Sequence, residues 1–287
     1  MSPMDIVFHA GMHKTASTHL QQRLQRRLPA LEQAGLRFYG PQYFRNEMTG
    51  VPATLGIGQS DMHHTLEQRV GPGRRMIISE ENYLGLLVAS SGRLMHDGLY
   101  PNAADRIDGL ARAVAPHRFH LALGLRNPAT LYVSAYCQAL FKGHYRPWDN
   151  FTKDVQWDQL NWSKVILPMA DRGGCASITL WRYEDYHDVF DQIIQCLLGT
   201  PHPDIPADLS ERTHEGLSAA AVAACADWHT ENHRGPLGIL AREDFPVSED
   251  YPKYNPWDAT ALAALTDQYN KDIAKLRTHP GVTFLAG

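Results

Sequence analysis

The sequence predicts an α/β fold in which helices cover both faces of a parallel β-sheet. The segments 5–9, 75–80, 119–126 and 177–185 are expected to be strands, and each is a near-continuous apolar run, as is typical of strands buried on both faces. Helical patterns separate these segments along the chain, and this alternation favours a parallel sheet. Because 287 residues without an internal repeat or low-complexity segment suit one large domain, residues 1–287 are expected to form a single domain.

The first third of the chain is expected to begin with a strand at Asp5–His9 and a helix after Lys14. Pro29 predicts a break near the end of that helix. Its apolar residues recur at three- and four-residue spacing and form one stripe, made of Leu20, Leu24, Leu28 and Leu31. Glycines bracket a second short strand at 35–40, and residues 41–73, rich in Gly, Pro, Asn and His, predict a long loop with one short helix.

The middle of the chain alternates strands with helices. A helix is expected at 105–115, and Pro128 suits the first turn of the helix after the strand 119–126, because its missing N–H costs nothing there. A helix at 157–171 is expected to end at Gly173 and Gly174, and Gly199 is expected to end the helix that follows the fourth of these strands.

The last third carries two further helices. Ser218 is a good N-cap, with Leu217 and Val222 placed for a hydrophobic staple. Residues 235–256 contain several Pro, Gly and acidic residues and predict a mobile surface loop. A C-terminal helix is expected at 257–278, with one apolar face formed by Leu262, Leu265, Tyr269, Ile273 and Leu276.

The composition is that of an ordinary globular protein, with 44% hydrophobic residues, 20% charged residues and a net charge of −4. The basic residues are scattered, which argues against a nucleic-acid partner. No stretch approaches the roughly 18 apolar residues of a membrane span, and the N-terminus has no signal-peptide pattern. The four cysteines contain no C-x-x-C pair, so reduced thiols and a cytoplasmic location are expected.

Polar residues follow the first strand in the segment HAGMHKTASTHLQ, at the edge where ligands of such sheets bind. Gly11 lets the backbone approach an anion, Lys14 supplies a charge, and the following helix start favours a negative group. The hydroxyls of Thr15, Ser17 and Thr18 add hydrogen-bond donors. The spacing departs from the P-loop pattern G-x-x-x-x-G-K-[ST], because His13 stands where the second glycine belongs. The alternative to an anion site is that Gly11 only turns the chain and Lys14 only begins a solvent-exposed helix.

Two other strand ends also carry reactive side chains. Arg126 and, further along, Ser134 outline a second anion site, although a lone arginine could equally pair with a carboxylate. Glu80 and Glu81 lie at the end of the expected strand 75–80, where a partly buried glutamate could act as a general base. Adjacent residues of an extended segment face opposite ways, so only one of them is expected to face a pocket.

Two anion sites restrict the ligand. A nucleoside triphosphate needs Mg²⁺, for which Thr15 and Glu80 could serve, so an ATP-dependent small-molecule kinase is one candidate function. A nucleotide with phosphate at both ends of its ribose would occupy both sites without a metal. A catalytically inert nucleotide-binding scaffold is a third possibility.

The segment HAGMHKTASTHLQ resembles the 5′-phosphosulfate loop of sulfotransferases, and LRNPATLYVSAY is similar to their 3′-phosphate motif. IISEEN resembles the strand end that supplies the base in some bacterial and carbohydrate-type members, and the similarity spans about residues 5–220. The resemblance implies a P-loop NTPase-like sulfotransferase fold and a sulfotransferase that uses 3′-phosphoadenosine 5′-phosphosulfate (PAPS) without a metal and releases 3′,5′-adenosine bisphosphate (PAP).

By this resemblance, the donor's 5′ end would be held by Gly11, His13, Lys14, Thr15, Ala16, Ser17 and Thr18. The 3′-phosphate would lie at Arg126 and Ser134, and Arg212 would contact the nucleotide. Lys14 would assist the leaving group, and the base would be Glu81, with Glu80 second and His13 third. Ala16 and Ser17 stand where the family has Gly and Thr. Because alanine disfavours positive φ, Ala16 is expected to adopt helical angles.

The acceptor stays open among sugar, lipid headgroup, phenol and peptide tyrosine, and the oligomeric state is not predicted. His63 and His64 could line an acceptor pocket, whereas His229 and His233 lack a third ligand and do not predict a zinc site. The aromatic residues between 145 and 162 could stack on a sugar or line a lipid groove, but are more typical of core packing; they are Tyr145, Trp148, Trp157 and Trp162.

Overall fold

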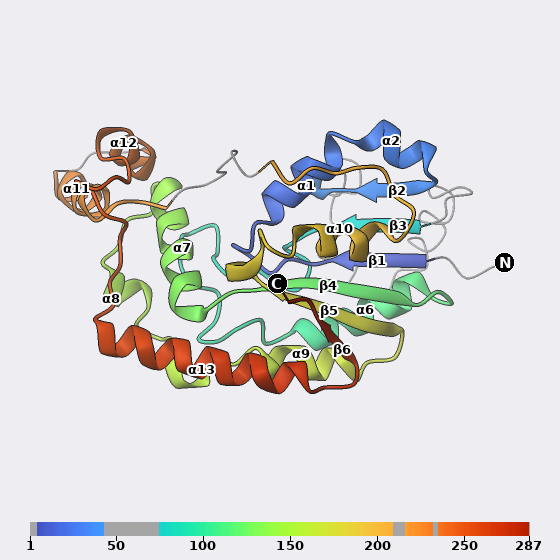
Figure 1. The fold of residues 1–287 in the computed structure, drawn as a ribbon. Coiled ribbons are helices and arrows are strands. Elements are labelled where there is room, and N and C mark those ends of the chain that lie inside the picture. Colours follow the sequence, from blue (N-terminus) through green and yellow to red (C-terminus); the bar gives the residue numbers. More distant parts are fainter. Residues whose placement is uncertain (1–4, 43–74, 209–215, 232–234, 287) are drawn as a thin grey trace.

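The protein is described by a computed structural model that covers residues 5–42, 75–208, 216–231 and 235–286. Six strands form one all-parallel sheet in the order β2-β3-β1-β4-β5-β6 (Figure 1). The strands are β1 Asp5–His9, β2 Leu36–Tyr39, β3 Arg75–Ser79, β4 Phe119–Leu125, β5 Cys175–Arg182 and β6 Val282–Phe284. The predicted α/β class with a parallel sheet is therefore confirmed.

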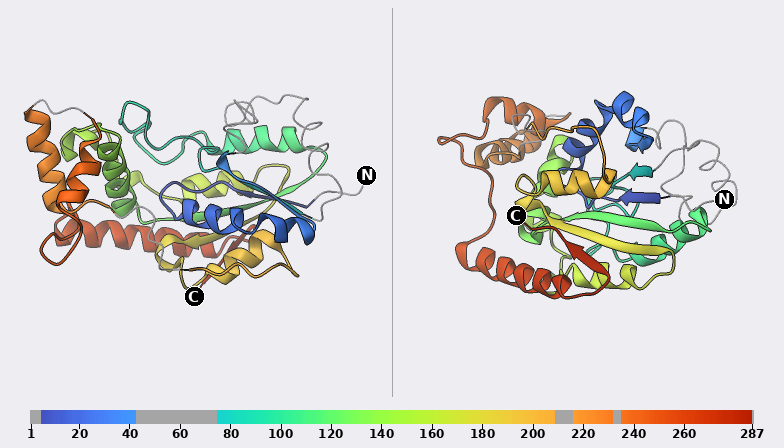
Figure 2. Two further views of the ribbon diagram at one scale, coloured as in Figure 1. Left: turned by 90° about the horizontal axis from the view of Figure 1, so that it is seen from above. Right: turned by 45° about the vertical axis from the view of Figure 1, so that its right-hand side comes forward.

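Helices cover both faces of this sheet (Figures 1 and 2). The helices of the described chain are α1 Ser17–Gln25, α2 Leu28–Gln33, α6 Ala103–Val114, α7 Pro128–Phe141, α8 Trp148–Phe151, α9 Ser163–Ala170, α10 Phe190–Leu198, α11 Ala219–Thr230, α12 Leu237–Asp244 and α13 Ala259–Arg277. Consecutive strand residues serve opposite layers, because side chains alternate along a strand. Phe8 packs in the core shared with α6, α7, α9 and α13, whereas Val7 packs in the core shared with α1 and α10.

The strands run toward α7, so their carboxyl ends face the side of the molecule that carries α7, α11 and α12 (Figure 1). Figure 2 shows α11 and α12 beyond the end of the sheet, next to α7. A Cβ atom on Gly238 of α12 would lie 2.7 Å from the Leu140 carbonyl carbon of α7. The absence of a side chain at Gly238 therefore lets these two helices touch through their backbones.

The expectation of a mobile loop over 235–256 is wrong for 237–244, which form α12. The helix starts directly after Pro236 and buries Leu237 and Ala241 on one face. Its Gly and acidic residues resemble a loop locally, but the close contact with α7 requires the glycine.

Other boundaries differ from the predicted ones for visible reasons. The helix expected at 157–171 is a 3₁₀ turn, Trp157–Gln159, followed by α9, whose first N–H, that of Ser163, donates to Asp272 (3.0 Å). The helix after Lys14 breaks at Arg26 and Arg27, and Pro29 lies in the first turn of α2.

At the C-terminus, α13 begins at Ala259 instead of 257, because Asp258 caps it by accepting from the N–H of Ala261 (2.7 Å). The short edge strand β6 was not predicted. Ser218 caps α11 as expected, accepting from the N–H of Ala221 at 3.0 Å.

Almost all of the loop predicted at 41–73 lies outside the described residues, as do His63, His64, Arg212 and His233. None of the helices in the described ranges combines the length and the apolar character needed to cross a membrane.

Candidate functional site

The centre of the sheet brings together the three strand ends that carry the candidate residues. β1 pairs with β3 on one side and with β4 on the other. From β1 the chain goes to the edge strand β2 and returns to β3, next to β1. It then crosses to β4 on the other side of β1, so the strand order reverses at β1. Ligands of open parallel sheets bind at such a point.

The segment after β1, residues 10–16, forms the loop that we call the lysine loop. It is tied to β4 by two backbone hydrogen bonds: the N–H of Gly124 donates to the Gly11 carbonyl (2.8 Å), and the N–H of Met12 donates to the Gly124 carbonyl (3.1 Å). Gly11 has φ 100°, and a Cβ atom there would lie 3.2 Å from Cβ of Glu81. Only glycine suits both this conformation and this close approach.

The expectation that Ala16 keeps helical angles is wrong. Ala16 is left-handed, with φ 65° and ψ 19°, and Lys14 also has a positive φ of 63°. Ala16 is the N-cap of α1, and its carbonyl accepts from the N–H of Leu20 at 3.1 Å. The left-handed conformation costs alanine about 1 kcal/mol, which the fixed ends of the lysine loop offset.

Two predicted hydroxyl groups point into the lysine loop. The hydroxyl of Thr15, only 1% exposed, donates to the Met12 carbonyl at 2.6 Å, and that of Ser17 donates to the same oxygen at 3.3 Å. Thr15 also lies against Gly124, where a Cβ atom would come within 2.9 Å of Cβ of Thr15. These side chains therefore shape the loop, while the first backbone N–H groups of α1, including that of half-buried Thr18, have no acceptor within the helix and favour an anion.

Arg126 follows β4 and reaches the lysine loop directly. Its Nη1 donates to the Lys14 carbonyl (2.8 Å), its Nε donates to the hydroxyl of Thr130 (3.0 Å), and its guanidinium lies 4.2 Å from the centre of the Tyr183 ring. Burial lowers the pKa of Arg126, and burial followed by the nearby Arg126 charge lowers the pKa of Lys14. In the described parts of the chain, neither cation forms an ion pair with a carboxylate. Two adjacent, partly desolvated cations form a site that an anion would stabilise.

Of the residues that follow Arg126, Asn127 has a structural role and Ser134 is a candidate ligand group. Asn127 caps α7 by accepting from the N–H of Ala129 (3.0 Å), and its own N–H donates to Glu184 (2.9 Å). Ser134 is half-buried on α7, one helical turn beyond Thr130 and on the same face as that residue. It therefore lies along the helix from Arg126, not beside it.

Glu80 and Glu81 have different environments, as expected for neighbours on an extended segment. Glu80 is 1% exposed, and its Oε1 accepts from the N–H of Asn82 at 2.9 Å. Glu81 is half-buried, packs against Gly11, and accepts from Nε2 of Gln21 at 3.1 Å. The stem of the Glu81 side chain packs against Gly11 of the lysine loop, and its charge is near enough to Lys14 to raise the pKa of that lysine.

A buried polar chain continues from Glu81 into the core. Nε2 of Gln21 also donates to Oγ of Ser79 (3.0 Å), which is 2.7 Å from Nδ1 of His9. Burial lowers the pKa of His9 to about 4, so the imidazole is neutral near pH 7. Its ring stacks on Trp181 with centroids 5.9 Å apart. No local pattern points to Gln21 as a site residue, because its partner Ser79 is distant along the chain.

His13 is fixed by three contacts. Its ring nitrogens lie 2.7 Å from the hydroxyl of Tyr100 (Nδ1) and 3.1 Å from Oδ1 of Asn82 (Nε2), and its backbone N–H donates to the same hydroxyl at 3.2 Å. Because the Asn82 oxygen only accepts, Nε2 carries the proton and Nδ1 accepts from Tyr100. His13 therefore anchors the lysine loop to the segment after β3.

The remaining candidates lie apart from the lysine loop. Trp162 is fully buried, and its Nε1 donates to the Arg126 carbonyl at 2.9 Å. Trp148 and Trp157 pack on Trp257 at centroid distances of 5.7 and 4.7 Å, and Tyr145 packs on the ring of His229 (5.0 Å).

Two surface hollows of about 550 and 360 Å³ border α9 and not the lysine loop. Within the described ranges, no group of three or more His, Cys, Asp or Glu residues is arranged to hold a metal ion. No protein-family model matches this sequence, and no curated protein compared with it is significantly similar.

Proposed function

We propose that the protein is a sulfotransferase that uses PAPS and belongs to the P-loop-like α/β type. The observation that carries the proposal is the closeness of two cations at the strand-order reversal: Arg126 donates to the backbone carbonyl of Lys14, and Glu81 packs against the same loop. The donor set fits a nucleotide with two anionic ends: Lys14 and the start of α1 for one, Arg126 and the face of α7 with Ser134 for the other.

Each group would have a defined task in an in-line displacement. Glu81 would take the proton of the acceptor hydroxyl as the acceptor oxygen forms its bond to sulfur. The bond between sulfur and the bridging 5′-phosphate oxygen breaks, and its electron pair stays on that oxygen. Lys14 would stabilise the charge that grows there.

The local geometry favours this proposal over an ATP-dependent kinase. The Thr15 hydroxyl, which would be the Mg²⁺ ligand of a kinase, donates to the Met12 carbonyl within the loop. One oxygen of Glu80, the matching acid, already accepts from the backbone of Asn82. Thr15 and Glu80 are each 1% exposed, so neither side chain presents an oxygen to solvent, where a hydrated Mg²⁺ would bind.

Thermal unfolding with PAP, set beside ATP with Mg²⁺, tests the proposal. At 100 times its Kd, PAP is expected to raise Tm by about 5 °C. The shift should disappear in Lys14→Ala and Arg126→Ala and persist in Lys271→Ala, a matched loss of charge on the outer face of α13. If only ATP with Mg²⁺ raises Tm, the sulfotransferase proposal is wrong and the kinase becomes the better-supported function.

A further inference from the structure

Gln21 of α1 is bonded directly to the carboxylate of Glu81. Its side chain is buried, and its amide nitrogen Nε2 donates to Oε2 of Glu81 (3.1 Å) and to Oγ of Ser79 (3.0 Å). An amide NH₂ group has two hydrogens, one for each of these acceptors. The reversed amide would turn its oxygen toward an ionised carboxylate, which only accepts hydrogen bonds. The chemistry of Glu81 therefore fixes the orientation of the Gln21 amide.

The second partner of Gln21 belongs to the centre of the sheet. Ser79 is the last residue of β3 and pairs with His9, the last residue of β1. Both residues are buried, and Oγ of Ser79 lies 2.7 Å from Nδ1 of His9. Gln21 is therefore bonded on one side to two central strands and on the other side to the candidate base.

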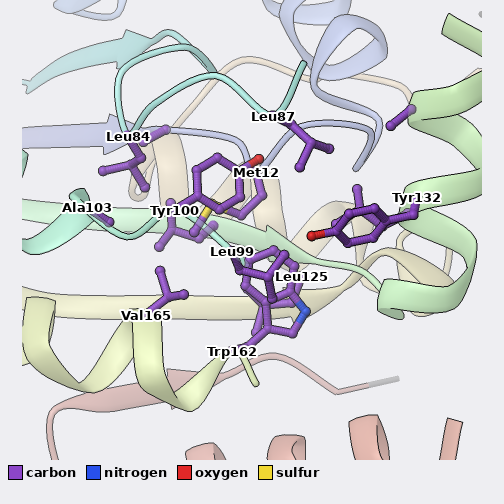
Figure 3. Packing of buried hydrophobic residues seen from close by; sticks show 14 of the residues in the cluster. Met12, Leu84, Leu87, Leu99, Tyr100, Ala103, Leu125, Tyr132, Trp162 and Val165 are labelled. Carbon is purple, nitrogen blue, oxygen red and sulfur yellow. The ribbon is translucent and has the colours of Figure 1, made fainter. Parts of the chain in front are cut away.

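The helix that carries Gln21 is also fixed at its start. Ser17 lies one turn before Gln21 on the same face of α1, and its hydroxyl donates to the Met12 carbonyl. Met12 is fully buried, and Figure 3 shows it next to Tyr100 in the core. The apolar stripe of α1 packs in the core shared with α10. α1 therefore sets the distance between its own anion-binding start and the carboxylate that Gln21 holds.

We propose that Gln21 is a positioning residue for sulfate transfer. It holds Oε2 of Glu81, so the carboxylate keeps its place relative to a donor bound at the start of α1. The proton of the acceptor hydroxyl goes to Oε1 of Glu81, and the Gln21 amide neither gains nor loses a proton. This inference rests on the proposed function, because it assigns a task to Gln21 in that reaction. Since Gln21 acts through Glu81, its loss lowers turnover and leaves donor binding intact.

The first test measures the release of sulfate from radiolabelled PAPS, with water in place of the acceptor. Gln21→Met is compared with Gln22→Met, the same change at an exposed neighbour on α1. We expect Gln21→Met to lower kcat about tenfold, with the KM for PAPS and the PAP-induced rise in Tm unchanged. Gln22→Met should alter none of the three. An unchanged kcat in Gln21→Met would overturn the proposal. A weakened PAP shift would also overturn it, because Gln21 would then only support the lysine loop.

The second test does not depend on the reaction. It is a double-mutant cycle in urea unfolding at pH 7, made of Gln21→Met, Glu81→Met and the double variant. Each single change leaves the other group without this hydrogen bond, so the double variant should be about fivefold less destabilised, in its unfolding equilibrium constant, than the product of the single effects. A cycle of Gln22→Met with Glu81→Met should show no such coupling.

The two tests separate the possible failures. Independent effects of Gln21→Met and Glu81→Met would mean that Gln21 does not hold the carboxylate, which would overturn the proposal whatever the reaction. If wild type neither responds to PAP nor releases sulfate, the sulfotransferase is wrong and the task of Gln21 in it falls as well. Coupling in the cycle would then show that the contact between Gln21 and Glu81 is real and belongs to another activity.

Discussion

Gly124→Ala is expected to weaken the proposed nucleotide binding without changing any charged group. Gly124 lies inside β4, and a Cβ atom there would be 2.9 Å from both Cβ of Thr15 and Nε1 of Trp181. Ordinary contacts begin near 3.4 Å, so both of these distances have to lengthen by about 0.5 Å. Trp181 is fully buried and stacked on His9, so Thr15 is expected to move and to carry the lysine loop with it.

The cost of this overpacking is about 1–3 kcal/mol, which corresponds to a fall in Tm of roughly 2–6 °C for a chain of this size. Differential scanning fluorimetry with and without PAP measures both effects. We expect a lower Tm without ligand and a much smaller shift with PAP than in wild type. Gly173→Ala is the matched control, because a Cβ atom there meets nothing within 4 Å. A full PAP shift in Gly124→Ala would refute the argument that Thr15 packing sets the lysine loop.

Three further predictions concern His9, Ser218 and Glu81. Because the pKa of His9 falls from 6.5 to about 4 on folding, the unfolded chain takes up its proton first; stability should therefore decline by about 3 kcal/mol as pH falls from 6.5 to 4. In His9→Gln the difference in unfolding free energy between pH 7 and pH 4.5, measured by urea unfolding, should be smaller than in wild type. An equal difference in the two proteins would contradict this prediction. Ser218→Ala removes bonds to the Ala221 N–H (3.0 Å) and the Phe245 carbonyl (2.8 Å) and should cost about 1–2 kcal/mol in chemical unfolding. Glu81→Gln keeps the packing against Gly11, so it should retain the PAP shift while sulfate transfer is lost; an inert scaffold would have no turnover to lose.

Strand positions were predictable because their signal is local. The runs at 5–9, 75–79 and 119–125 are buried on both faces, so their side chains are apolar regardless of neighbours. The lysine loop was also visible, because Gly11 and Lys14 follow a buried strand. β6 was not predicted, because a strand of three residues at the edge of a sheet is too short to show a recognisable hydrophobic pattern.

The details of the site depend on distant contacts, and these were not predictable. The left-handed Ala16 contradicts its residue preference and is maintained by a loop tied to Gly124 and Arg126. Gln21 is a polar residue among the leucines of α1, and its role depends on contacts with Ser79 and Glu81, which are far away in the sequence. Tyr132 on α7 has a buried hydroxyl with no hydrogen-bond partner in the described parts of the chain, and this is likewise a property of the packed core and not of the local sequence.

The position of β1 at the centre of the sheet sets the order in which the molecule can be assembled. Asp5 pairs with Arg75, and Ile6 pairs with Phe119, so β1 has no partner strand close to it in the sequence. Roughly 110 further residues have to be synthesised before β4 exists, about 5–20 s at ordinary rates. During that time the lysine loop lacks Gly124 and Arg126 and cannot take its final shape. Such long-range pairing is also slow to form in the free chain. A nascent fragment that ends at Arg118 would therefore contain every residue of the loop and still bind no nucleotide.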